Sequence, residues 1–154
     1  MNLEKIKLED DKHLFCVTAK SFPDGILEAH QTLHKQISFK KNRNYYEFSY
    51  MNPEHQIIYK AAAEELESGE FGNINLETFK IKKGNYNSIT VKDYEQNIPK
   101  IKEAFDELKK NPNIDPNGVA LEWYSDGPDC KCMIRLKDNF KNLNKRIIKW
   151  QIQK

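Results

Sequence analysis

Two glutamates with aromatic neighbours are the residues best placed to do chemistry. Glu122 lies in the middle of the stretch 118–126, and Glu47 has the same place in the stretch 44–50. Both stretches have the apolar, aromatic and β-branched composition of strands. Burying a carboxylate in a strand is costly unless it is paired or hydrogen-bonded, so each glutamate either faces water or has a partner. A carboxylate among aromatic rings can bind an organic cation, through its charge and through cation–π attraction.

The residues around these glutamates form the candidate ligand site. Tyr124 follows Glu122 by two positions and therefore shares its face of the strand. Because only every second residue of a strand reaches a given face, most of the other aromatic side chains are expected to pack in the core. We predict a ligand-binding site composed of Glu122, Tyr124, Trp123, Tyr46 and Glu47.

Length and charge exclude several classes of protein. A chain of 154 residues is long enough for one domain with a substantial core. A net charge of +2 gives no electrostatic footprint for nucleic acid, and the apolar runs are too short to span a bilayer. Acidic residues stand where a signal peptide would be apolar, and three cysteines without an export signal favour a reducing compartment. We expect a cytoplasmic protein that does not bind nucleic acid directly and does not enter a membrane.

Two other clusters have the spacing of metal ligands. His30 and His34 are four residues apart on a predicted helix, but they have no obvious third ligand, and His30 falls on the apolar stripe. Cys130 and Cys132 share one strand face, but a single Cys-x-Cys without a second pair is weak evidence for zinc. Packed histidines and ordinary buried thiols are favoured. We therefore predict no metal ion and no cofactor.

The two glutamate strands occupy similar positions in two similar halves of the chain. In each half a strand precedes an amphipathic helix, and the glutamate strand and a last strand follow it. Residues 1–13 carry little pattern. The expected strands are 14–22, 45–51, 55–63, 76–82, 86–92, 118–126 and 130–136, with residues 61–66 ambiguous between strand and helix, and the expected helices are 26–37 and 98–110.

This order predicts a single domain, 1–154, of the α+β class. Repeat one covers about 13–67 and repeat two about 76–136. Two βαββ pseudo-repeats would form an antiparallel sheet with two amphipathic helices on one face and a ligand cleft between the repeats. The tail 137–154 is either a short helix packed on the domain or a solvated basic segment.

The chain resembles the GyrI-like small-molecule-binding domains, which also occur as effector-binding domains of some MerR-type and AraC-type transcription activators. The resemblance covers about residues 13–136, and the order of its parts carries it. Those parts are Phe22-Pro23-Asp24-Gly25, the segment 58–63, the segment 79–86 with its Gly84-Asn85-Tyr86 turn, the helix 98–110, Leu121-Glu122-Trp123-Tyr124 and the strand 132–136.

The resemblance implies a ligand cleft at the junction of the two repeats, with Glu122 recognising cationic or polar groups of the ligand. No DNA-binding domain accompanies this chain, so we expect a stand-alone effector-binding or sensor protein for a hydrophobic ligand that is cationic or aromatic.

Two alternatives stay open. Some members of the family are hydrolases that open cyclopropane-bearing toxins, which would make Glu122 a general base with Tyr124 or Tyr46 as proton donor. The family name comes from an inhibitor of DNA gyrase, so a protein partner is a third possibility. The sequence does not decide whether the protein is an enzyme.

Overall fold

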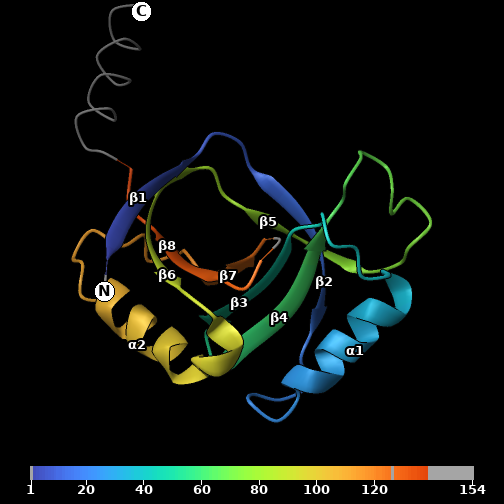
Figure 1. Cartoon of the computed structure of the whole chain (residues 1–154), viewed down its shortest axis with the longest axis horizontal. Coiled ribbons are helices and arrows are strands. Elements are labelled where there is room, and N and C mark those ends of the chain that lie inside the picture. The colour runs from blue at the N-terminus through green and yellow to red at the C-terminus, as the bar shows by residue number, and fades with distance from the viewer. Residues whose placement is uncertain (1, 126, 139–154) are drawn as a thin grey trace, which may run out of the picture.

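A computed structural model describes residues 2–125 and 127–138. Eight antiparallel strands form one sheet that curls into a half-barrel, and two helices pack on its outer face (Figure 1). This is the α+β architecture that the sequence predicts. The elements are β1 (Leu3–Leu8), β2 (Lys12–Thr18), α1 (Ile26–Gln36), β3 (Tyr45–Met51), β4 (Ile57–Glu64), β5 (Glu77–Ile81), β6 (Gly84–Val91), a 3₁₀ turn η1 (Tyr94–Gln96), α2 (Ile98–Leu108), β7 (Ala120–Tyr124) and β8 (Cys130–Arg135).

The strand order is symmetric about the contact between β3 and β7. The order is β1-β6-β8-β7-β3-β4-β2-β5, so β4 and β2 follow β3 outwards just as β8 and β6 follow β7. Each half is a βαββ unit, with its helix between its first two strands. The two edge strands are exchanged between the halves, because β1 pairs with β6 and β5 pairs with β2. Two pseudo-repeats therefore meet at the β3–β7 pair.

Each helix buries an alanine and a leucine one turn apart against its own half of the sheet. In α1 this stripe packs on β2 and β4, where Ala61 and Ala63 leave room for the helix. Fully burying a leucine stabilises the fold by about 1.5–3 kcal/mol. The equivalent residues are Ala29 and Leu33 in α1, and Ala104 and Leu108 in α2.

The opposite, inner face of the sheet holds the central core. Because side chains alternate, the neighbours of each glutamate in β3 and β7 point to this inner face. Tyr46, Phe48 and Leu121 are buried there, and Trp123 packs against them. The outer face of β3 and β7 therefore carries the glutamates.

The N-terminal segment differs from the expectation that residues 1–13 carry little pattern. Residues 3–8 form β1, an edge strand on which only Ile6 and Leu8 are partly buried. The apolar residues Leu3, Ile6 and Leu8 are unevenly spaced among two lysines and a glutamate, so the alternation signal was weak.

Other elements begin or end at residues different from those predicted. Strand β2 begins at Lys12 and ends at Thr18, several residues before Phe22. The alanines at 61–63, ambiguous from propensity, lie in β4, where Ala61 and Ala63 pack beneath α1 and Ala62 packs in the inner core. Leu27 is an apolar residue of α1 but does not join its buried stripe, because it is 68% exposed. The predicted tail alternatives concern mainly residues 139–154, which lie outside the described residues.

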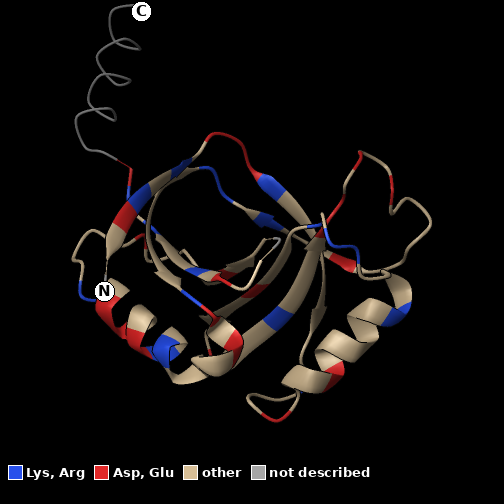
Figure 2. Cartoon of the chain, viewed as in Figure 1, with Lys and Arg blue, Asp and Glu red and all other residues tan. Residues whose placement is uncertain are grey.

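Charged residues of both signs are spread over the elements (Figure 2). Lysines and arginines alternate with acidic residues along the chain instead of gathering on one helix or strand. In the described part of the chain, no helix has the length and apolar character needed to cross a membrane.

Candidate functional site

A groove runs between the two helices, with the β3–β7 pair as its floor. Helix α1 covers β2 and β4, and α2 covers β6 and β8, so neither helix covers the central pair (Figure 1). The groove contains a cavity of about 950 Å³ that is lined by residues of both halves. The sequence predicted a cleft between the two repeats, and this cavity lies at that position.

The walls of this cavity are mostly apolar. Four large hydrophobic side chains that are 45–60% exposed line it: Phe22, Met51, Ile57 and Ile98. Ile101 and Phe105 of α2 and Ile134 of β8 add apolar surface deeper in the cavity. Exposed apolar side chains that gather around one concavity mark a binding site.

Glu47 and Glu122 face each other at the centre of the floor. They are direct cross-strand partners in the β3–β7 ladder, and both line the cavity. The hydroxyl of Tyr124 lies 2.6 Å from Glu122 Oε1 and 3.3 Å from Glu47 Oε2, so it bridges the two carboxylates. The pseudo-twofold axis thus produces a glutamate pair connected by one phenol.

The surroundings of the two glutamates are not symmetric. His30 precedes Glu47 by 17 positions, and its Nε2 lies 2.6 Å from Glu47 Oε1. The residue that precedes Glu122 by 17 positions is Phe105. The first glutamate therefore has a histidine partner, while the equivalent position on the second helix carries an apolar ring that also lines the cavity. Among the described residues, Glu122 has no ion pair.

This asymmetry separates the proton affinities of the two carboxyl groups. Burial and the nearby charge of Glu47 raise the pKa of Glu122 to about 8, and the Tyr124 hydrogen bond opposes this only in part. Burial also acts to raise the pKa of Glu47, but the hydrogen bond and charge of His30, with help from Tyr59 and Tyr124, hold that pKa below its ordinary value. At neutral pH Glu47 is ionised and Glu122 is protonated.

The tyrosines of the site stay neutral. Burial, and then the adjacent carboxylates, raise the pKa of Tyr124 and of Tyr59 far above the ordinary value. Tyr59 lies with its hydroxyl 3.5 Å from His30 Nε2, and Tyr94 packs edge-on against Tyr124 at 4.8 Å between ring centres. These hydroxyls can donate or accept hydrogen bonds, but they supply no charge.

The cavity contains further charges that have partners of their own. Lys102 pairs with Asp106 on α2 at 2.9 Å, and Asp115 pairs with Arg135 at 2.9 Å. Lys109 of α2 also lines the cavity and has no ion pair among the described residues, so it adds a basic side chain to the chemistry of the glutamate pair.

The five residues predicted from the sequence divide between the two faces of the sheet. Glu122, Glu47 and Tyr124 come together in the cavity. Tyr46 and Trp123 do not line this cavity; they stack at 6.3 Å between ring centres and lie with the inner core. Tyr46 hydrogen-bonds to Glu64, and Trp123 to Asn44, at 3.2 Å each.

The predicted site did not include three residues that the fold brings to the glutamates. They are His30, Tyr59 and Tyr94. Only His30 carried a signal, because it stood on the otherwise apolar stripe of its helix. Its predicted role as a packed side chain did not include a carboxylate partner, which comes from a strand 17 positions later.

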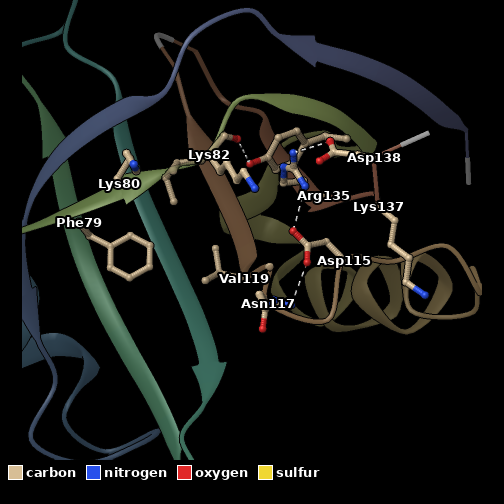
Figure 3. Close-up of a pocket in the computed structure, with 12 residues that line it drawn as sticks. Phe79, Lys80, Lys82, Asp115, Asn117, Val119, Arg135, Lys137 and Asp138 are labelled. Atoms are coloured by element: carbon tan, nitrogen blue, oxygen red, sulfur yellow. Dashed lines mark hydrogen bonds and ion pairs between the residues drawn. The ribbon is translucent and has the colours of Figure 1, made fainter. Parts of the chain in front are cut away.

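A second cavity, of about 250 Å³, surrounds Arg135 (Figure 3). The guanidinium group is buried and bonds to Asp115 at 2.9 Å, to Asp138 at 3.0 Å and to the carbonyl of Lys83 at 2.9 Å. It is therefore saturated, and its role is structural. Through Asp115 it holds the segment 115–119, in which Asp115, Gly118 and Val119 line both this cavity and the large one.

Several solved structures have the same overall fold. The structure of SAV2435 bound to tetraphenylphosphonium aligns with a TM-score of 0.62 and 10% identity, over 90% of this chain and 95% of that one. The protein therefore has the fold expected from its resemblance to GyrI-like domains. An integron cassette protein from the mobile metagenome of Vibrio cholerae aligns with a TM-score of 0.63 and 11% identity, over 89% of this chain and 97% of that one. A hydrolase from Listeria innocua aligns with a TM-score of 0.53 and 9% identity, over 88% and 92% of the two chains.

These likenesses concern the fold. No protein-family model matches the chain, and no curated protein matches it in sequence.

Proposed function

We propose that this protein binds a hydrophobic organic cation in the cavity between its two repeats, with Glu122 as the residue that recognises the positive charge. The single observation that carries the proposal is a buried carboxyl group without an ion pair among the described residues, at the floor of an apolar cavity of about 950 Å³. A cationic ligand can give such a group the ion pair that it does not have within the described residues.

Charge and shape support the same class of ligand. Aromatic rings from Tyr59, Tyr94 and Tyr124 stand around the glutamate pair and offer negative ring faces to a cation. The apolar walls favour bulky hydrocarbon groups over a small hydrated ion. The fold shared with SAV2435, which was solved with tetraphenylphosphonium, makes this cation the natural first probe.

Protonation of Glu122 gives the proposal a second, specific feature. Because the pKa of Glu122 is raised to about 8, the carboxyl group must lose a proton to meet a cation at neutral pH. We expect cation binding to release a proton below pH 8, and the affinity to rise with pH up to that point.

Thermal shift with tetraphenylphosphonium tests the proposal. The cation should raise the melting temperature of the wild-type protein by mass action and should leave Glu122→Gln nearly unchanged. Glu107→Gln is the matched control, because Glu107 is on the exposed face of α2, and it should respond like the wild type. Equal shifts for wild type and Glu122→Gln would contradict the role of Glu122.

Hydrolysis is a second candidate, favoured by the opposite protonation states of the two carboxyl groups. An ionised Glu47 and a protonated Glu122, joined through Tyr124, are the base and the acid that such a reaction needs. In this candidate Glu47 activates water and Glu122 supplies a proton. Consumption of a cyclopropane-bearing compound by wild type, but not by Glu47→Gln, would establish it.

A further inference from the structure

The groove does not end at the glutamate pair. Along the floor, Tyr45 lies opposite Tyr124, beyond Glu47 and Glu122, on the side away from Ser49 and Ala120. At this end a smaller cavity, of about 180 Å³, lies beside the large one. Three residues line both cavities: Glu47, Tyr94 and Tyr124. The edge-on pair of Tyr94 and Tyr124 thus stands between two chambers of one groove.

The small chamber is lined by aromatic rings that the proposed cation site does not use. Phe39 stacks on Tyr45 with 5.2 Å between ring centres and 9° between ring planes. His34 stands at 5.4 Å from Tyr45 and 6.3 Å from Phe39. Phe39 is 70% exposed, so the core does not require its position.

Local hydrogen bonds hold this aromatic group in place. The backbone N–H of Lys40 donates to the Tyr45 hydroxyl at 2.8 Å, and His34 Nδ1 lies 3.3 Å from the carbonyl of Ile37. The segment after α1 is therefore anchored to both rings that flank Phe39. The result is a preformed aromatic wall instead of a loosely attached loop.

The size of the chamber decides what can occupy it. A dry protein cavity of about 150 Å³ is large enough for a single benzene ring. The chamber of about 180 Å³ therefore fits one six-membered ring, but not the bulky apolar group proposed for the large cavity.

We propose that this chamber is a second subsite for one planar aromatic ring, and that the preferred ligands are two-part cations with a bulky apolar group on one side of Tyr124 and a tethered ring on the other. This inference rests on the proposed cation-binding function and extends it. The cationic centre would lie near Glu122, and the tether would pass Tyr124. The ring of the ligand would stack on the Phe39–Tyr45 pair, and this stacking favours flat aromatic rings over saturated ones.

Three triphenylphosphonium salts test the subsite. Methyltriphenylphosphonium has no tethered ring, 3-phenylpropyltriphenylphosphonium carries a planar ring, and the 3-cyclohexylpropyl analogue carries a saturated ring of similar size. Isothermal titration calorimetry on the wild-type protein should rank the phenyl compound tightest, about three- to tenfold above the cyclohexyl compound.

Two variants distinguish binding in the small chamber from binding in the large cavity. Phe39→Leu removes the ring but keeps an apolar side chain, and it should abolish the preference for phenyl over cyclohexyl while leaving methyltriphenylphosphonium binding unchanged. Phe22→Leu is the matched control in the large cavity, and it should weaken all three compounds by the same factor.

Each outcome has one meaning. A phenyl preference that disappears in Phe39→Leu alone supports the subsite. Equal binding of the phenyl and cyclohexyl compounds, or a preference that survives in Phe39→Leu, overturns the subsite but leaves the cation site intact. If none of the three cations binds, the proposed function fails and the subsite fails with it.

Discussion

Replacing Glu122 by glutamine should stabilise the protein, and by an amount that depends on pH. The pKa of Glu122 is about 8 in the folded protein, against 4.5 for the free side chain. A carboxyl group whose pKa is raised by folding contributes stability that is fully present below pH 4.5 and is lost as the pH rises towards 8. Glutamine cannot ionise, so the variant escapes this loss.

The size of the effect follows from the same pair of values. Each pH unit between the unfolded and folded pKa lowers the free energy of unfolding of the wild-type protein by about 1.4 kcal/mol. Glu122→Gln should therefore be more stable than wild type by about 3 kcal/mol at pH 7 and by at most about 5 kcal/mol above pH 8. Glutamine also retains an oxygen that can accept the Tyr124 hydrogen bond. Urea unfolding of wild type and Glu122→Gln should therefore give equal free energies near pH 4, with the variant increasingly more stable up to pH 8.

Glu47→Gln is the matched variant, with the opposite sign. The pKa of Glu47 is lowered in the fold, so its carboxylate contributes stability that is present above pH 4.5 and is lost on acidification. Glu47→Gln should be less stable than wild type at pH 7, and the difference should shrink only as the pH falls below 4.5. Parallel stability curves for wild type and Glu122→Gln between pH 4 and 8 would refute the assignment of a protonated Glu122.

Three further substitutions test the surroundings of the site. His30→Gln removes the partner of Glu47 and should lower the free energy of unfolding at pH 7 by about 1–3 kcal/mol, measured in urea, whereas an unchanged value would show that the 2.6 Å contact contributes nothing. Arg135→Met leaves Asp115 without its partner and should cost about 3–5 kcal/mol; a smaller loss in thermal unfolding would mean that the buried pair is dispensable. Gly84→Ala should also destabilise the fold, by about 1–3 kcal/mol in the same assay, because Gly84 has φ +133° and an added Cβ would lie 2.7 Å from the Arg135 guanidinium; wild-type stability would show that the turn adapts.

Local pattern was sufficient to predict the central elements of the fold. The strand 45–51 and the amphipathic helix starting at Ile98 were correctly predicted, because strand composition and helical spacing are properties of neighbouring residues. Edge strand β1 was missed, since it buries little and carries little alternation. The exchange of β1 and β5 between the halves is a long-range pairing that no local pattern encodes.

The site was predictable only where strand alternation applied. Glu122 and Tyr124, two positions apart, share a face, and the repeat places Glu47 directly opposite Glu122. The same alternation sends Tyr46 and Trp123 to the inner core, and applying it strictly would have separated them from the glutamates. His30, Tyr59 and Tyr94 reach the site from other elements, so their contacts with the glutamates depend on the packing of α1, β4 and η1.

We expect the cavity to recognise the positive charge of an apolar ligand. Tetraphenylphosphonium and tetraphenylborate have nearly the same shape and opposite charges, so their affinities compared at pH 6 and pH 8 isolate the charge. We predict that the cation binds at least about tenfold more tightly than the anion at pH 8, and that its affinity falls at pH 6 as Glu122 retains its proton. Equal affinity for the two ions, or a cation affinity that does not change between the two pH values, would show that the cavity does not recognise positive charge through Glu122.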